Sequence, residues 1–69
     1  MLTAEEATER AKALASHEGW DLADYEDPVA EREGTSWIVR FEGREKRPGN
    51  HFVVFIDSTT GEAELWPGR

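Results

Sequence analysis

Every second side chain is apolar along two stretches of the chain, residues 37–42 (WIVRFE) and residues 51–57 (HFVVFID), and this spacing constrains the fold most. Residues 63–66 (AELW) repeat the pattern over a shorter length. A period of two is typical of a β-strand that buries one face, because successive side chains of a strand point to opposite sides. The side chains that share the face predicted to be buried are Trp37, Val39, Phe41, Phe52, Val54, Ile56, Ala63 and Leu65.

Turn residues between these stretches predict how the strands connect. Residues 58–61 (STTG) make a short connection, in which Asp57 accepts bonds from the turn and Gly61 takes a positive φ angle. A further strand around 29–33, which opens after Pro28, would turn at residues 33–36 (EGTS) and pair with 37–42. Short connections join antiparallel neighbours, so we expect a meander of three or four antiparallel strands.

The N-terminal segment predicts a helix with a clear start. Thr3 and Glu6 have the spacing of a capping box, in which the side chain of each residue bonds the backbone N–H of the other. Gly19 is the expected end, because glycine readily adopts the left-handed conformation that stops a helix. The apolar stripe between these two ends consists of Ala4, Ala7, Ala11 and Leu14. A stripe made mostly of alanine buries little surface alone, so this helix needs a sheet to pack on.

Together these elements predict one α+β domain over residues 1–69, in which the N-terminal helix packs on one face of the antiparallel meander sheet. The segment 20–27 (WDLADYED) stays open in this prediction as a strand, a covering loop or a second short helix.

The composition of the chain indicates the cellular compartment of such a domain. The chain has no cysteine and therefore no disulfide or thiolate metal site, which favours a reducing compartment. The longest apolar run, residues 52–56, is far shorter than the roughly 20 residues that span a membrane. Residues 1–12 (MLTAEEATERAK) are acidic where a secretory signal has a basic and then an apolar region. We therefore expect a cytoplasmic protein that does not bind membranes.

The negative charge lies in one half of the chain. Residues 1–33 hold ten acidic and three basic side chains, a net charge of −7, whereas residues 34–69 hold five of each. Such a surface repels nucleic acid and favours a basic protein partner. Three acidic residues of the open segment, Asp24, Glu26 and Asp27, are predicted to join that contact. The alternative is a solvated acidic surface that keeps a small protein soluble.

No residue pattern predicts catalysis, a metal or another cofactor. His17 and His51 lack a second histidine at metal-ligand spacing. His51 and Asp57 are too far apart to form a dyad, because six residues of strand span about 20 Å. The acidic run 21–33 does not follow the order of a calcium-binding loop. The basic loop 43–50 (GREKRPGN) is expected to be a hydrated surface loop rather than an anion site.

The second face of the predicted sheet also carries apolar side chains, and one helix covers only one side of a sheet. An apolar patch with a polar rim indicates contact with another molecule. The alternative is that Trp20, Leu22 and Tyr25 fold back over this face. The apolar residues of the predicted patch are Ile38, Val53, Phe55 and Trp66, and the rim residues are Arg40, Glu42, His51, Asp57, Glu62 and Glu64.

Three stretches of the chain resemble small bacterial helix-plus-sheet domains of two related kinds. These stretches are LTAEEATERAKAL, SWIVRF and IDSTTGEAEL. The stretch PGNHFVVFIDSTTGE is similar to the YrhB-like immunity proteins of polymorphic toxin systems, which have a Gly-Asn loop before an apolar strand and a terminal Asp-to-Gly turn. The A-E-E-A helix start and the D-x-x-T-G-E turn resemble PepSY-like domains, for which a protease-inhibitory role is implied. Both resemblances imply a binding or inhibitory module without its own chemistry.

These observations lead to one functional expectation and one alternative. We expect a non-enzymatic protein-interaction module of the immunity or inhibitor type, whose partner is a toxin or a protease. The predicted contact residues are Ile38, Arg40, Val53, Phe55 and Trp66 on the second face, together with Asp24, Glu26 and Asp27. The alternative is a structural homodimer formed through the same face of the sheet.

Overall fold

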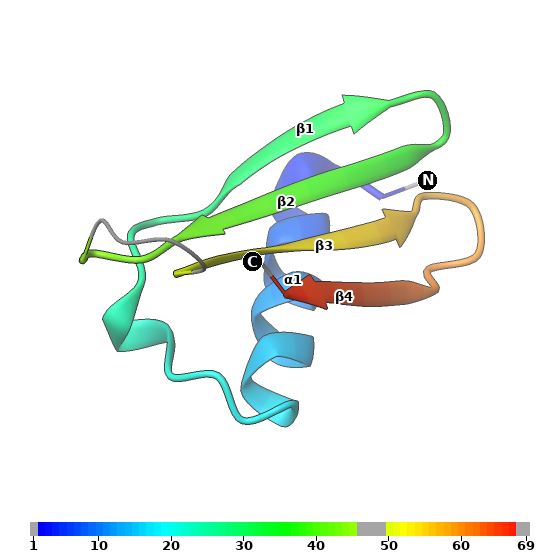
Figure 1. Ribbon diagram of the computed structural model, residues 1–69. Helices are drawn as coiled ribbons and strands as arrows, with labels where there is room; N and C mark the ends of the chain where they lie inside the picture. The colour runs from blue at the N-terminus through cyan, green and yellow to red at the C-terminus, as the bar shows by residue number, and fades with distance from the viewer. Residues whose placement is uncertain (1, 46–49, 68–69) are drawn as a thin grey trace.

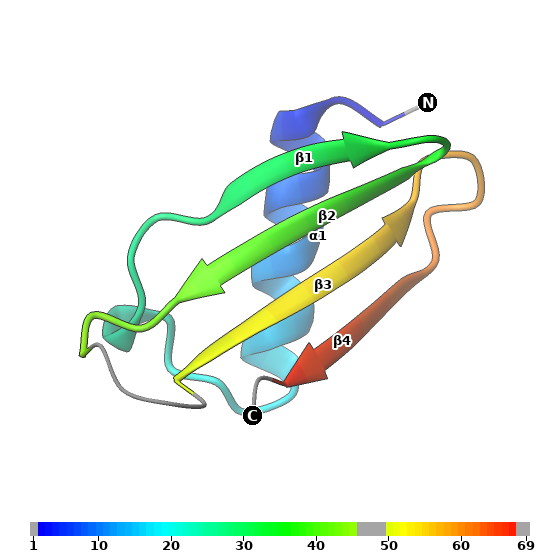
Figure 2. The same cartoon turned by 45° about the horizontal axis from the view of Figure 1, so that its top comes forward.

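The computed structural model describes residues 2–45 and 50–67, which form one helix, one short 3₁₀ turn and four strands (Figure 1). The sheet is antiparallel throughout and has the strand order β1-β2-β3-β4, as predicted for a meander. Helix α1 crosses one face of this sheet and contacts all four strands (Figure 2). The elements are α1 (Ala4–His17), η1 (Leu22–Asp24), β1 (Val29–Glu33), β2 (Ser36–Glu42), β3 (His51–Asp57) and β4 (Ala63–Pro67).

Helix α1 begins at the predicted capping box. The Thr3 backbone N–H donates to Glu6 Oε1 at 2.9 Å, and the Glu6 backbone N–H donates to Thr3 Oγ1 at 3.1 Å. At the other end, Gly19 has a φ of 93°. Its N–H donates to the Ser16 carbonyl, and the Trp20 N–H donates to the Ala15 carbonyl. This pair of bonds is a Schellman motif, which satisfies the last carbonyls of the helix and turns the chain back toward the sheet.

Alanines form the face of α1 that meets the sheet. Ala7, Ala11 and Ala15 are fully buried, at a spacing of four residues. The predicted stripe was wrong at its first member, because Ala4 is exposed, and it omitted Ala15. Leu14 is only partly buried. Small side chains let the helix backbone come close to the strands, so the larger sheet residues fill the core.

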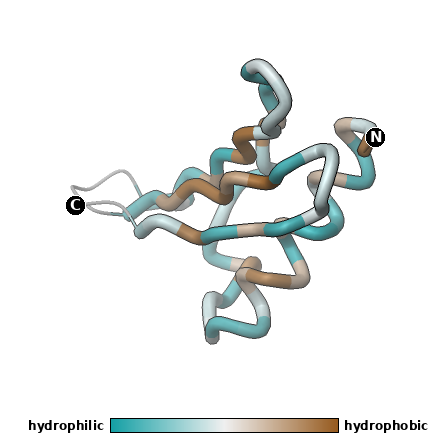
Figure 3. The backbone as a smooth tube through the Cα atoms, turned by 90° about the vertical axis from the view of Figure 1, so that its right-hand side faces the viewer, coloured by the Kyte–Doolittle hydropathy of each residue, from teal (hydrophilic) through white to brown (hydrophobic). Residues whose placement is uncertain are grey.

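The core lies between α1 and the inner face of the sheet. Its largest fully buried side chains are Phe41, Phe52, Ile56, Val39 and Val54. Hydrophobic and hydrophilic residues alternate along the strands (Figure 3), as the period of two predicted. Leu65 and Trp37 are partly buried against this core. Ala63 lies on the inner face opposite Ile56, as predicted, but it is exposed rather than buried because it lies at the start of the edge strand β4.

The segment 20–27, which the sequence left open, contains η1 and closes one end of the same core. The Trp20 and Tyr25 rings lie 4.5 and 5.0 Å from the ring of Phe52, measured between centroids. The Phe52 ring also stacks on Phe41 at 4.5 Å. Leu22 packs against this cluster as well. The segment therefore lies on the helix side of the sheet.

The connection between β3 and β4 matches its prediction. The Asp57 carboxylate accepts from the backbone N–H groups of Thr59 and Thr60 at 2.8 and 3.1 Å. Gly61 has a φ of 80°. These bonds hold the two strands in a fixed register, with Phe55 opposite Glu64 and Val53 opposite Trp66.

Candidate protein-binding surface

The strand register defines the composition of the sheet face that points away from α1, which we call the outer face. Side chains of one parity line up across the sheet, so that Arg40, Val53 and Trp66 form one row with Val29, and Ile38 and Phe55 lie in the next row. The outer face consists of Val29, Glu31, Glu33, Ser36, Ile38, Arg40, Glu42, His51, Val53, Phe55, Asp57, Glu64 and Trp66.

Apolar side chains meet at the centre of the outer face, and we call this group the apolar patch. Phe55 is 38% exposed and Trp66 is 54% exposed, whereas Ile38 and Val53 are partly buried. The Phe55 and Trp66 rings meet edge to face, with centroids 6.4 Å apart and planes at 89°. Val53, Phe55 and Trp66 line a shallow depression whose surface is almost wholly apolar. The members of the apolar patch are Ile38, Val53, Phe55 and Trp66.

The open question of what covers this patch has an answer within the described residues. Trp20, Leu22 and Tyr25 pack on the inner face, so this segment does not fold back over Phe55. No other described element lies on the outer face, because α1 and η1 both lie on the opposite side (Figures 1 and 2). An antiparallel sheet with one solvated face normally has polar side chains there. The apolar patch is an exception to that pattern.

Charged side chains surround the patch. The Arg40 guanidinium lies 3.5 Å from the Glu31 carboxylate, and both side chains are about half exposed. Such an exposed ion pair contributes little to stability. It places the guanidinium of Arg40 beside strand β1. The other charged side chains of the outer face are carboxylates, from Glu33, Glu42, Asp57 and Glu64, and His51 lies beside Glu42 in the register. The rim is acidic on most sides.

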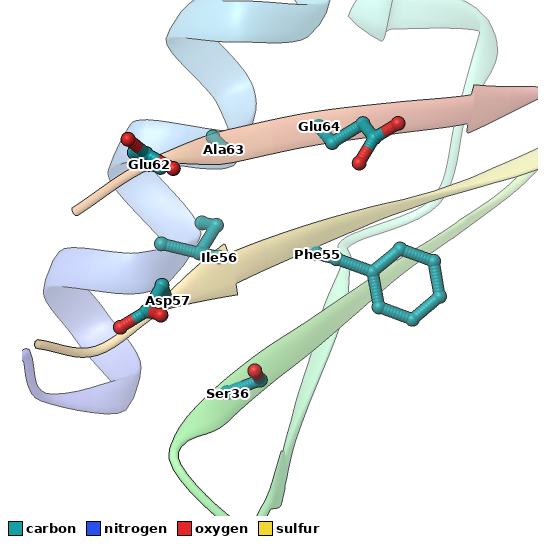
Figure 4. Close-up of a pocket in the computed structure, with 7 residues that line it drawn as sticks. All are labelled: Ser36, Phe55, Ile56, Asp57, Glu62, Ala63 and Glu64. Atoms are coloured by element: carbon teal, nitrogen blue, oxygen red, sulfur yellow. The ribbon is translucent and has the colours of Figure 1, made fainter. Parts of the chain in front are cut away.

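A second depression lies at the β3–β4 end of the outer face (Figure 4). Phe55 and Glu64 point to one side of the sheet in this view, while Ile56 and Ala63 point toward α1. The residues that line the depression are Ser36, Phe55, Ile56, Asp57, Glu62, Ala63 and Glu64. This set places three carboxylates beside one aromatic ring and contains no basic side chain. Such a combination suits a Lys or Arg side chain that also contacts Phe55.

Two of the three predicted acidic residues of the segment 20–27 adjoin the outer face. Glu26 and Asp27 line a depression at its corner together with Val29, Glu31, Arg40 and Glu42. Asp24 lies elsewhere, in a depression with Tyr25, Arg44, Glu45 and Asn50. The structure therefore brings together seven of the eight predicted contact residues, and Asp24 is the one that it separates from them.

Val29 is an outer-face residue that the sequence analysis missed. It is 58% exposed and extends the row of Arg40, Val53 and Trp66 to the edge of the sheet. The signal was present in the two-residue turn at 34–35, because pairing Glu33 with Ser36 places Val29 opposite Arg40.

The structure gives no grouping of side chains that indicates a metal site within residues 2–45 and 50–67. His51 and Asp57 lie at opposite ends of β3, as expected. Ser58 is buried, and its hydroxyl donates to the Thr35 carbonyl at 2.7 Å. Of the basic loop 43–50, residues 46–49 lie outside the described residues. Among the described helices, none has the length and apolar character needed to cross a membrane.

No protein-family model, no curated protein and no solved structure matches this chain. Its assignment to the YrhB-like or the PepSY-like group stays a prediction.

Proposed function

We propose that this protein is a non-enzymatic binding module that contacts another protein through the outer face of its sheet. The observation that carries the proposal is the apolar patch, in which Phe55 of β3 and Trp66 of the edge strand β4 are exposed beside each other on the outer face. Aromatic side chains at the centre of a contact supply much of its binding energy, since they bury large areas with few rotatable bonds.

The packing of the domain gives a further reason to look for a partner. Its core is complete on the helix side, where Phe41, Phe52 and Ile56 are almost fully buried. The patch residues Phe55 and Trp66 contribute little to that core, because they point to the other side of the same strands. Exposed aromatic residues that a fold does not need for its own stability mark interaction surfaces.

The surroundings of the patch favour an immunity-type or inhibitor-type module. A polar rim around an apolar centre is the usual anatomy of a protein contact. The rim is acidic, and a toxin or protease with a basic surface would complement it. This proposal agrees with the resemblance of the helix start and the β3–β4 turn to the two groups of bacterial domains.

The test is capture of a partner from a lysate of the source cells by three immobilised proteins: the wild type, Phe55→Glu and Ala13→Glu. Phe55→Glu places a carboxylate at the centre of the patch. Ala13→Glu adds the same charge at an exposed position of α1, away from the outer face. We expect a protein that the wild type and Ala13→Glu retain and that Phe55→Glu loses. A partner retained equally by all three would contradict a contact through the outer face.

The alternative, a homodimer through the same face, is tested by light scattering on the purified wild type and Phe55→Glu. A dimer that Phe55→Glu converts to a monomer would favour the alternative. A wild-type monomer is the result that the proposed function predicts.

A further inference from the structure

We infer that the partner surface that covers the outer face is a cationic amphipathic segment of another protein, with apolar side chains between two groups of Lys or Arg. This inference rests on the proposed function and specifies the chemistry of the partner.

The outer face is strongly negative. In the four strands as the structure describes them, this face has five carboxylates and one guanidinium, a net charge of −4 with His51 neutral. The guanidinium of Arg40 lies beside Glu31, at 3.5 Å, rather than over the apolar patch. Glu26 and Asp27 add negative charge at one corner. A partner that desolvates this face without bringing positive charge would place its net negative charge beside buried surface, which is unfavourable.

The negative charges lie at both ends of the patch. Glu42 lies at one end of the outer face, beside the corner formed by Glu26 and Asp27. Asp57 lies at the other end, and Glu64 lies directly opposite Phe55. The patch lies between Glu42 and Asp57, and the length of β3 from residue 51 to residue 57 gives a separation of about 20 Å. A helix covers this distance with about 13 residues. The matching segment therefore has cations at both ends and apolar residues in the middle.

A second copy of this chain is a poor match for the outer face. In a two-fold face-to-face contact the same surface meets itself, so two faces with the same net negative charge would come together. The Arg40 side chain, already paired with Glu31, offers a single positive group per face for this arrangement. Like charges across an interface oppose association. The charge pattern therefore favours a basic partner over a homodimer.

The experiment uses the full chain and two synthetic amphipathic helical peptides of about 18 residues. Their apolar faces are identical, and their polar faces carry either Lys or Glu. Binding is followed by amide NMR titration at low salt. We expect the Lys peptide to shift the amide signals of Val53, Phe55 and Trp66 and the indole N–H signal of Trp66. Its affinity should exceed that of the Glu peptide by at least about tenfold, and it should fall at about 0.5 M salt.

Two double variants test whether peptide binding depends on the carboxylates of the outer face or on the net charge of the whole protein. The variant Glu33→Gln/Glu64→Gln removes two outer-face carboxylates, and Glu5→Gln/Glu18→Gln removes two from α1 and its C-cap. Both change the net charge by the same amount. The first variant should weaken binding of the Lys peptide at least about threefold more than the second. The variant Phe55→Ser should weaken binding of the Lys peptide without a change in its charge preference.

The outcomes distinguish this inference from the proposed function. Equal binding of both peptides at the outer face would overturn the cationic partner and leave a binding module in place. Equal weakening by the two double variants would also overturn the inference, because binding would then depend on the net charge of the whole protein. Signal shifts confined to α1 would overturn it as well, because the peptide would then bind away from the outer face. A wild-type dimer that Phe55→Ser dissociates would replace the basic partner with a second copy. Loss of partner capture by the control Ala13→Glu would count against the proposed function instead, because it would place the contact on α1.

Discussion

Phe55 and Trp66 meet edge to face on neighbouring strands, with ring centroids 6.4 Å apart, on the sheet face opposite α1. On the inner face of the same sheet, Phe41 and Phe52 stack at 4.5 Å and are almost fully buried. The stacked pair belongs to the core and the edge-to-face pair to the surface, and the two pairs have different roles. The first holds the fold together, and we propose that the second binds a partner.

The free energy of unfolding should respond very differently to the loss of one ring from each pair. Phe41→Ala removes a side chain that is 1% exposed, so we expect a loss of about 3 to 5 kcal/mol. Phe55→Ala removes a ring that is 38% exposed, and a loss of about 1 kcal/mol is expected. Urea denaturation of both variants measures the two values. Equal losses would mean that Phe55 also belongs to the folding core.

The capping box of α1 should contribute measurable stability. Thr3→Ala removes the oxygen that accepts the Glu6 N–H, and we expect a loss of about 0.5 to 2 kcal/mol. The matched control is Thr8→Ala. The Thr8 hydroxyl bonds the Ala4 carbonyl within the helix, where alanine is a better helix former, so a small effect is expected. Thermal melts of both variants test this difference, and an unchanged melting temperature for Thr3→Ala would place the helix start elsewhere.

The Glu6 carboxylate should make part of this stability depend on pH. Hydrogen bonds from Thr3, first from its backbone N–H, lower the pKa of Glu6 below its ordinary value of 4.5 in the folded protein. Because the folded state favours the ionised form, the stabilisation is present above pH 4.5 and is lost as the pH falls through the lowered pKa.

The measurement compares melting temperatures of the wild type and Glu6→Gln across this range. Glutamine keeps the acceptor oxygen of a capping box but does not titrate. The advantage of the wild type should be greatest near neutral pH and should shrink in acid. A constant difference from neutral pH into strong acid would show that ionisation of Glu6 does not support the cap.

The acidic corner of the outer face should speed association with a basic partner. The variant Glu26→Gln/Asp27→Asn removes two carboxylates that adjoin the outer face, whereas Asp24 lies in a separate depression. We expect the double variant to lower the association rate constant and its salt dependence, because screening acts within about 10 Å at 0.1 M salt. Asp24→Asn should have a smaller effect. Stopped-flow mixing with the captured partner gives both rates, and a rate unaffected by salt would remove this corner from the contact.

Local patterns predicted most of this fold because each depended on nearby residues. The capping box needs only Thr3 and Glu6, and the β3–β4 turn needs only Asp57 and the residues up to Gly61. The alternation along β3 also placed Phe52 and Phe55 on opposite faces before any pairing was known.

The remaining features depend on contacts between distant parts of the chain. Trp20 and Tyr25 have no periodic pattern of their own, and their contact with Phe52 places them on the inner face. The exposure of Val29 depends on the register between β1 and β2. Ala4 shares the helix face of Ala11 and Ala15, but it is the first residue of α1 and is exposed, whereas Ala15, one turn beyond Ala11, is buried. The sequence therefore predicted which side chains of each strand point to the outer face. It did not predict that Val29 extends this face at β1.

The most direct measurement of the central claim is the affinity of the captured partner for the wild type, Phe55→Glu and Ala13→Glu by titration calorimetry. A carboxylate at the desolvated centre of a contact should weaken binding by about 2 kcal/mol or more, which is about thirtyfold. Ala13→Glu should bind as the wild type does. Phe55→Glu should melt a few degrees lower than the wild type, since loss of the ring costs about 1 kcal/mol, but it should be folded at the temperature of the titration. Equal affinities of the wild type and a folded Phe55→Glu would contradict the claim that the outer face binds the partner.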